Sequence, residues 1–142
     1  MSPNINTQEK TLERIDAANP GAVRGWAMDH CDLIDPRDVV RAGKLGLMWS
    51  CNPRNAISSS AAAAFGEAVL NTHAVPIKSM IDVGINVSLE GEGVSTFWDS
   101  IELSITRKDD NGKVWWPDQR VDRITALRMA TQNGANYVLK GT

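Results

Sequence analysis

The chain has 142 residues, of which 42% are hydrophobic and 23% charged, and its formal net charge is −2. This length and composition are typical of one globular domain that can bury a core. The small negative charge and the lack of a basic run argue against a nucleic-acid-binding surface. No apolar stretch approaches the roughly 20 residues of a membrane span, and the polar N-terminus lacks the apolar region of a signal peptide. We therefore expect a cytoplasmic protein that binds neither nucleic acid nor membrane.

The chain contains two cysteines, Cys31 and Cys51. Two are too few for a disulfide framework, and they form no CxxC pair of the kind that indicates a structural zinc site. Both follow short apolar runs, so we expect reduced, partly buried thiols. A nucleophilic cysteine is the alternative.

The first half of the chain alternates helices with short apolar runs. Apolar spacing predicts a helix over residues 7–19, which an Asn-Pro-Gly turn ends, and a strand over residues 24–30. A second helix begins near Pro36, with an aspartate in the capping position before it, and stops near Gly46. Residues 47–51 form the second apolar run, and a loop and a weak helix rich in serine and alanine follow.

The second half continues this alternation. A compact helix opens at Pro76, and residues 85–92 predict a third strand in which apolar and polar side chains alternate. Further helices are expected over residues 98–106 and 121–139. Strands that alternate with helices indicate parallel βα units and an α/β fold. From the last two helices, the side chains expected to face the core are Trp98, Ile101, Ile105, Ile124, Leu127, Thr131 and Val138.

Three chemically capable side chains stand at the ends of the expected strands: His30, Cys51 and Glu92. In a parallel sheet or barrel these ends lie at the same edge, where α/β enzymes place their active sites. A histidine and a carboxylate that meet there could bind a divalent metal or exchange protons. The alternative is a strand-end histidine that is only hydrogen-bonded.

Two carboxylates, Glu90 and Glu92, share one face of the third strand. They repel each other unless solvent, a cation or a shared proton relieves the charge. Leaving both charged in a dry core would cost several kcal/mol. This face is therefore either solvated, as in an edge strand, or functional.

Other side chains have structural interpretations that we favour over functional ones. His73 is expected at the surface or in a capping role rather than as a ligand. Trp115 and Trp116 are expected to pack, with an aromatic wall of a substrate pocket as the alternative. Arg54 is expected to be solvated, with contact to an anionic substrate group as the alternative.

Several segments, taken together, resemble the metal-dependent amidohydrolases. Residues 28–36, Met-Asp-His-Cys-Asp-Leu-Ile-Asp-Pro, resemble the sixth-strand segment of these enzymes, above all in amidohydrolase family 3, the branch that includes N-substituted formamide deformylase. Residues 47–53 resemble the seventh strand of that branch, and residues 76–87 its seventh helix and eighth strand. Residues 106–115 and 124–128 resemble the segment that follows barrel closure. The order and spacing of these segments, rather than any single motif, make the resemblance specific.

The resemblance implies a (β/α)8 barrel that holds one or two divalent metals, commonly zinc, and that hydrolyses non-peptide carbon–nitrogen bonds of small, amide-like molecules. By position, His30 corresponds to the sixth-strand histidine, which is a metal ligand or a substrate contact. Glu92 falls where the family has its eighth-strand aspartate, a general base and often a metal ligand. Because the usual Gly-Ser-Asp is Glu-Gly-Glu here, Glu90 is a second candidate for the catalytic role.

Residues 1–142 are thus expected to form a partial barrel domain that covers about strands six to eight with their helices. A complete barrel takes about 250 residues, and three strands cannot close one. By the resemblance, the remaining metal ligands would lie upstream of Met1. We expect the chain to be inactive alone and to need the missing part of the barrel or to self-associate. The alternative is a catalytically incompetent, truncated α/β domain that acts only in oligomerisation or partner binding.

Overall fold

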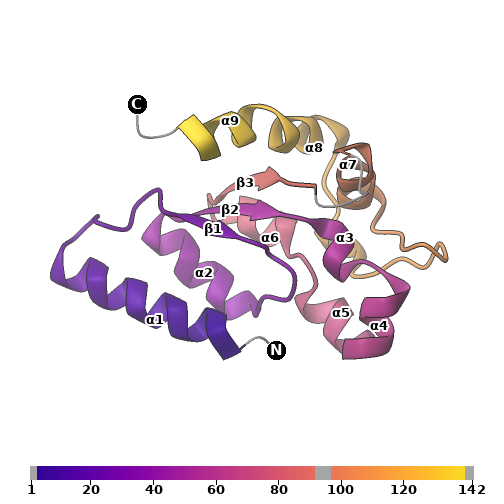
Figure 1. The fold of residues 1–142 in the computed structure, drawn as a ribbon, viewed down its shortest axis with the longest axis horizontal. Coiled ribbons are helices and arrows are strands. Elements are labelled where there is room, and N and C mark those ends of the chain that lie inside the picture. The colour runs from indigo at the N-terminus through magenta and orange to yellow at the C-terminus, as the bar shows by residue number, and fades with distance from the viewer. Residues whose placement is uncertain (1–2, 92–96, 140–142) are drawn as a thin grey trace.

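The computed structural model describes residues 3–91 and 97–139, and it contains a parallel sheet with helices on both faces (Figure 1). The strands are β1 (Ala27–Asp29), β2 (Met48–Cys51) and β3 (Asn86–Leu89), in the order β1-β2-β3. Both strand pairs are parallel, so the predicted α/β fold with parallel βα units is confirmed.

The register of the sheet brings the carboxyl ends of the three strands to one edge. Asp29 pairs with Ser50, and Ser50 pairs in turn with Ser88. One step further along, Cys51 pairs with Leu89. Residues that directly follow β1 and β3 therefore flank the end of β2.

Three helices cover one face of the sheet: α1 (Pro3–Ala18), α2 (Pro36–Leu45) and α6 (Ile77–Asp82). The predicted capping of α2 is present, because the Asp35 carboxylate accepts a hydrogen bond from the Arg37 backbone N–H at 2.9 Å. The Trp49 and Val87 side chains belong to the core on this side and are almost completely buried.

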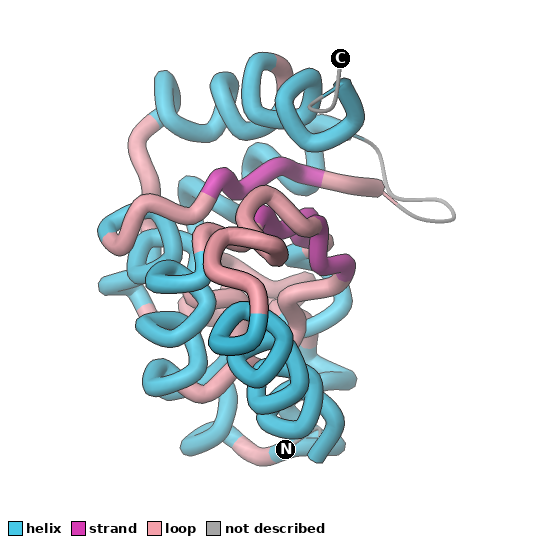
Figure 2. The backbone as a smooth tube through the Cα atoms, turned by 90° about the vertical axis from the view of Figure 1, so that its left-hand side faces the viewer, coloured by secondary structure: helices cyan, strands magenta, loops and turns pink. Residues whose placement is uncertain are grey.

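The opposite face of the sheet lies under α8 (Arg123–Ala130) and α9 (Gln132–Leu139), and Figure 2 shows the strands between these helices and the rest of the molecule. Polar contacts join the two layers. The Asn86 side chain donates to the Asn133 carbonyl at 3.1 Å, and the Asn133 side chain donates to the Val87 carbonyl at 2.9 Å. The Tyr137 hydroxyl donates to the Met28 carbonyl at 3.1 Å. The polar side of β3 is therefore covered by a helix rather than by water alone.

Four further helices complete the described fold: α3 (Pro53–Ala56), α4 (Ser59–Phe65), α5 (Glu67–His73) and α7 (Phe97–Thr106). A short 3-10 helix, η1 (Pro117–Gln119), lies between α7 and α8. In the part of the chain that the structure describes, no helix is both long and apolar enough to cross a membrane.

The prediction for the burial of α7 was wrong in part. Ile101 is buried as expected, but Trp98 is 67% exposed. The helix instead approaches the sheet through small side chains. The Ser100 hydroxyl donates to the Glu90 carbonyl at 3.0 Å, and the Ser104 hydroxyl donates to the Ser100 carbonyl at 2.8 Å. Since Ser100 faces the end of β3, Trp98, two residues earlier on the helix and about 200° away around it, points outward.

The single helix expected over residues 121–139 is two helices. Thr131 leaves the helical conformation at φ −128° and ψ −83°, and its hydroxyl donates to the Leu127 carbonyl at 2.6 Å. Because the break rotates the second helix relative to the first, a face defined by one continuous period does not exist. Contrary to the prediction, Ile124, Leu127 and Val138 are exposed.

Cys31 and Cys51 form a disulfide, so the expectation of reduced thiols was wrong. Each cysteine stands at the carboxyl end of its strand segment, and the parallel pairing of β1 with β2 brings their Cα atoms to 5.0 Å. Both side chains are completely buried. This disulfide could not be predicted from the sequence alone, because the pairing of the two cysteines depends on the register of β1 against β2.

The chain after α7 is fixed by Arg107, which is completely buried. Its guanidinium donates to three backbone carbonyls, those of Trp115 at 3.1 Å, Val75 at 2.9 Å and Ala74 at 2.7 Å. Burial, together with the nearby charge of Arg120, lowers the pKa of Arg107 to about 9. Trp115 is buried too, as the packing interpretation predicts.

Candidate functional site

His30 directly follows β1 at the carboxyl edge of the sheet. Its φ is 56°, a left-handed conformation that costs a residue with a Cβ on the order of 1 kcal/mol. The His30 carbonyl accepts a hydrogen bond from the Trp49 indole N–H at 3.3 Å. Since tertiary contacts hold the backbone in this unfavourable conformation, the direction of the imidazole is built into the fold.

Glu90 directly follows β3 and is anchored through both of its backbone polar groups. Its N–H donates to the Cys51 carbonyl at 3.0 Å, and its carbonyl accepts from the Ser100 hydroxyl at 3.0 Å. The Glu90 side chain is only 20% exposed, and its Oε1 atom is buried. Strand β2 on one side and helix α7 on the other thus hold this residue at the edge.

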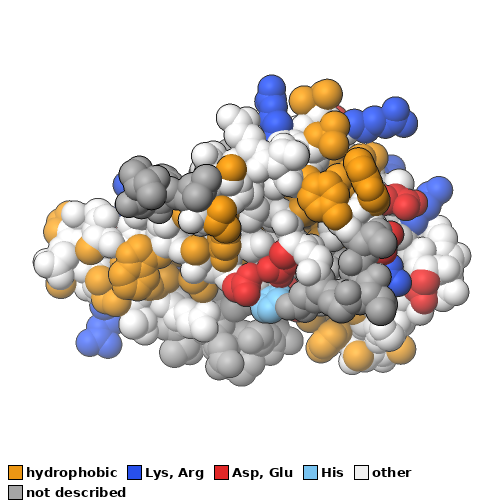
Figure 3. Space-filling view, turned by 45° about the horizontal axis from the view of Figure 1, so that its top comes forward, with side chains coloured by type: hydrophobic (Ala, Val, Ile, Leu, Met, Phe, Trp, Pro, Cys, Tyr) orange, Lys and Arg blue, Asp and Glu red, His pale blue; other side chains and the backbone are white. Residues whose placement is uncertain are grey.

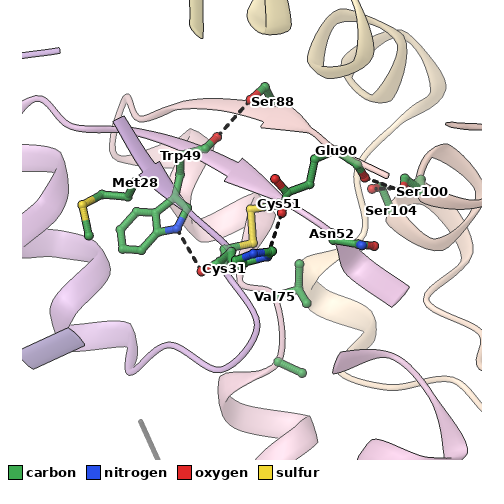
Figure 4. The surroundings of a disulfide bond; sticks show 12 residues. Met28, Cys31, Trp49, Cys51, Asn52, Val75, Ser88, Glu90, Ser100 and Ser104 are labelled. Atoms are coloured by element: carbon green, nitrogen blue, oxygen red, sulfur yellow. Dashed lines mark hydrogen bonds and ion pairs between the residues drawn. A yellow bond between two sulfur atoms is a disulfide. The ribbon is translucent and has the colours of Figure 1, made fainter. Parts of the chain in front are cut away.

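The structure brings His30 and Glu90 together. His30 Nδ1 lies 3.0 Å from Glu90 Oε1, and His30 Nε2 lies 3.8 Å from Asp29 Oδ2 (Figure 4 shows Glu90 beside the disulfide). The imidazole is 42% exposed, and Asp29 is more exposed still. Figure 3 shows a histidine at the surface directly beside acidic side chains. The imidazole is therefore accessible from solvent, whereas the Glu90 oxygen that faces it is buried.

The surroundings of Glu90 favour its protonated form. Burial and the neighbouring Asp29 carboxylate raise the pKa of Glu90 to about 7, against the opposing effects of His30 and Ser50. Tyr137, which reaches the same edge from α9, has a raised pKa because of burial and the charges of Asp29 and Glu90. A carboxyl group that titrates near neutral pH can both accept and donate a proton under physiological conditions.

The other residues singled out from the sequence are not part of this pair. Glu92 lies outside the described residues. Cys51 is in the disulfide, which removes it as a nucleophile. The His73 ring makes a 2.7 Å hydrogen bond with the Thr72 hydroxyl through Nδ1, and Arg54 lies 3.4 Å from Asp99 at the surface.

A metal site is not assembled by the described part of the chain. Within residues 3–91 and 97–139, no three histidine, cysteine, aspartate or glutamate side chains are grouped so that they could hold a metal ion. His30, the metal ligand implied by the family resemblance, is paired with Glu90 instead. The described residues alone therefore do not fit the divalent metal that the resemblance implies.

Sequence reasoning missed three groups that act on this pair: Asp29, Ser50 and Tyr137. Asp29 could have been found, since it directly precedes His30 and any strand that ends at the histidine brings its carboxylate to the same edge. The effect of Ser50 on Glu90 depends on the register of β2 against β3, which the sequence does not reveal. Tyr137 gave no local signal, because its position depends on α9 packing over the sheet.

An apolar groove of about 480 Å³ runs beside β1, between this strand and α1. β1 is one of the two edge strands of the described sheet. The groove therefore opens along the backbone edge of a strand that has only one neighbour. Its lining residues are Gln8, Thr11, Leu12, Ile15, Trp26, Ala27, Met28 and Asp29.

Two solved structures share this fold. One is an uncharacterised metal-dependent hydrolase from Pyrococcus furiosus, with 21% identity, a TM-score of 0.68, and coverage of 92% of this chain and 27% of that chain. The other is an uncharacterised metal-dependent hydrolase from Pyrococcus horikoshii OT3, with 20% identity, a TM-score of 0.71, and coverage of 91% and 27%. The parallel α/β arrangement is thus of a class that occurs in metal-dependent hydrolases.

The family itself follows from the sequence model of the amidohydrolase family, which matches residues 4–139. This chain belongs to the amidohydrolase family. It spans 27% of the length of each of the two similar solved structures. The comparison with curated proteins gave no significant match.

Proposed function

We propose that this chain is the segment of an amidohydrolase barrel that contains about strands six to eight, and that it contributes His30 and Glu90 to a hydrolytic site. The reaction is hydrolysis of a non-peptide carbon–nitrogen bond in a small, amide-like molecule, as in the N-substituted formamide deformylase branch. The observation that carries this proposal is the 3.0 Å contact between His30 and Glu90 at the carboxyl ends of the strands, with the pKa of Glu90 raised to about 7.

In this proposal Glu90 is the proton-transfer group. Its carboxylate accepts a proton from the attacking water and returns it to the nitrogen of the leaving amine, so that the group is unchanged after one turnover. The His30 ring lies beside this carboxylate, with Nδ1 3.0 Å from Oε1, and the Asp29 carboxylate is close to both groups, 3.8 Å from His30 Nε2 and near enough to Glu90 to raise its pKa. General acid–base catalysis of this kind contributes typically about 10²- to 10⁴-fold in rate.

By the family resemblance, the complete site would also hold a divalent metal, commonly zinc. Ligands from outside residues 1–142 would be needed to complete that metal site. From this chain, His30 and Glu92 would be its ligands. The proton-transfer role is assigned to Glu90 because of its 3.0 Å contact with His30 and its raised pKa. Glu92 remains the second candidate for the base.

The test uses the natural polypeptide that carries this sequence, with a panel of N-formyl amines, N-acyl amines and cyclic amides as substrates and zinc supplied. Glu90→Gln should lower kcat by about 10²-fold or more. The matched control is Glu67→Gln. Glu67 is an exposed glutamate that forms an ion pair with Lys113 and is not part of the His30–Glu90 pair. If Glu90→Gln keeps full hydrolytic activity while Glu92→Gln loses it, Glu92 rather than Glu90 is the general base. Full activity in both variants would refute the proposed site.

A second candidate function, association with a partner chain, is favoured by the groove beside β1. Trp26 is 48% exposed at this groove, and β1 is an edge strand of the described sheet, the position at which strand addition occurs. In this case the chain should sediment as an oligomer, Trp26→Asp should shift it toward the monomer, and no substrate of the panel should be hydrolysed. A monomer at micromolar concentration would contradict this candidate.

A further inference from the structure

The Cys31–Cys51 disulfide joins the two strand ends from which the candidate site is built. Cys31 is the residue after His30, and Cys51 is the last residue of β2. Both sulfur atoms are completely buried, and Figure 4 shows the bond directly beneath the region where Glu90 lies. The bond therefore crosslinks the segment that bears the histidine to the strand between the histidine and the glutamate.

The disulfide also has a direct connection to Glu90. The Cys51 carbonyl accepts the Glu90 N–H at 3.0 Å, while the carboxylate of Glu90 contacts the His30 ring at 3.0 Å. His30 and Glu90 are thus connected in two ways: directly, through the contact between their side chains, and indirectly, through Cys31, the disulfide and the Cys51 carbonyl. The indirect connection has one covalent crosslink, and that crosslink is the disulfide.

The backbone of His30 makes such a crosslink consequential. Its φ of 56° is rarely adopted by a residue with a Cβ, and conformations of this kind persist where the surroundings hold them. A covalent bond from the next residue to the neighbouring strand is such a restraint, and the hydrogen bond from Trp49 to the His30 carbonyl is a second one.

We propose that the Cys31–Cys51 disulfide is a positioning element that holds His30 against Glu90, so that the redox state of this bond controls the candidate site. Its effect on hydrolysis rests on the proposed function, but the position of His30 does not. Reduction separates the strand ends, and the imidazole leaves the Glu90 carboxylate.

The redox step is thiol–disulfide exchange with a dithiol reductant. A thiolate of the dithiol attacks one cysteine sulfur, breaks the Cys31–Cys51 bond and forms a mixed disulfide as the other cysteine leaves as a thiolate. The second thiolate of the dithiol then attacks the dithiol sulfur of the mixed disulfide and releases the remaining cysteine thiolate. The S–S bond between Cys31 and Cys51 accepts two electrons, two protons end on the cysteine sulfurs, and the dithiol becomes a cyclic disulfide. Because both sulfur atoms are buried, exchange requires local opening of the strand ends.

The test compares the oxidised and the dithiothreitol-reduced chain by NMR of the histidine rings. The sequence contains only two histidines, so His73 serves as the internal reference. We expect the His30 ring signals to shift or broaden on reduction while those of His73 stay in place. The double variant Cys31→Ser/Cys51→Ser should give the reduced-type spectrum and should not respond to dithiothreitol. If that variant does not fold, the comparison of the two redox states of the natural sequence stands alone.

Thiol counting by alkylation and intact mass gives the second measurement. Protein purified without reductant and denatured should have no reactive thiol, and reduced protein should have two. Two free thiols in the unreduced protein, with or without bound zinc, would overturn the proposal, as would identical His30 signals in both redox states.

Activity separates this proposal from the proposed function. In the natural polypeptide, reduction should lower hydrolysis about tenfold to a hundredfold, the scale expected for a displaced active-site group. If the His30 signals respond to reduction but no substrate is hydrolysed, the proposed function fails and the positioning role stands. If hydrolysis is present and equal in both redox states, the positioning role fails.

Discussion

His30 and Glu90 meet across a strand to which neither belongs. β1 and β3 lie on either side of β2, yet Nδ1 of the histidine is 3.0 Å from Oε1 of the glutamate. The contact is possible because both residues lie just beyond the paired part of their strands, where side chains can extend over the end of β2. A single register shift in either strand pair would separate them, so the pair depends on the architecture of the whole sheet.

The raised pKa of Glu90 predicts the pH dependence of hydrolysis. If the carboxylate is the base, activity of the natural polypeptide should rise with pH and level off above about 7, where Glu90 is ionised in the folded protein. The measurement is a pH profile of kcat/KM. Asp29→Asn removes a neighbouring negative charge and should move the rising limb to lower pH. An unchanged limb in this variant would contradict the electrostatic explanation.

Glu9 predicts a pH dependence of stability. This residue of α1 is completely buried, and burial together with the charge of Asp38 raises its pKa to about 8, although Arg41 lies 3.2 Å away. Its ordinary value is 4.5, so the folded protein retains a proton that the unfolded chain releases between these pH values. The free energy of unfolding should therefore fall as pH rises from about 4.5 to 8, by a few kcal/mol in total.

Glu9→Gln should flatten this decline, as measured by urea unfolding at pH 5.5 and pH 8. Glu13→Gln is the matched control, because Glu13 contacts the same arginine at 2.8 Å but has a lowered pKa through that hydrogen bond. The contribution of Glu13 to stability is present above its ordinary pKa of 4.5 and is lost only at lower pH, so Glu13→Gln should lower stability similarly at pH 5.5 and pH 8 and leave the decline between them in place. Equal pH profiles for the two variants would refute this assignment.

Arg107 predicts a large effect from a conservative change. Its three carbonyl contacts come from three guanidinium nitrogens, and a lysine ammonium cannot reach all three carbonyls. Arg107→Lys should lower the free energy of unfolding by about 2–4 kcal/mol, because buried carbonyls lose their donors. Arg120→Lys changes an exposed arginine that donates to one carbonyl, and it should stay within about 0.5 kcal/mol of the natural sequence in urea unfolding.

The disulfide predicts a loss of stability on reduction. Cys31 and Cys51 are 20 residues apart in the sequence, and closing a loop of this size is worth about 3 kcal/mol. Urea unfolding with and without dithiothreitol should show this difference. The Cys31→Ser/Cys51→Ser variant, measured the same way, should be insensitive to the reductant. A natural sequence that is equally stable in both conditions would contradict the crosslink.

The sequence could predict the parts of the fold that depend on local pattern. Alternation of helices with short apolar runs indicates parallel βα units, and the Asp-Pro pair indicates the start of α2; both are present. What could not be predicted depends on contacts between distant segments. Whether Trp98 faces in or out is decided by which side of α7 meets the end of β3, and Ser100 is on that side. The break at Thr131 likewise has no breaker residue such as proline to announce it.

The candidate site shows the same division. His30 could be selected from the sequence because it ends a strand-like run, and Glu90 because the alternation of polar side chains puts it on the same strand face as Glu92, the residue expected at the strand end. Their pairing could not be selected, since it requires both strand registers at once. The disulfide was missed for the same reason.

The central claim is that His30 and Glu90 act as one unit in hydrolysis, and a double-mutant cycle on kcat tests it most directly. In the natural polypeptide, His30→Ala and Glu90→Gln should each lower kcat by about 10²-fold or more. If the two residues act together, the double variant should be no worse than the more severe single variant by more than about tenfold. Losses that multiply, or single variants that retain full activity, would contradict the claim.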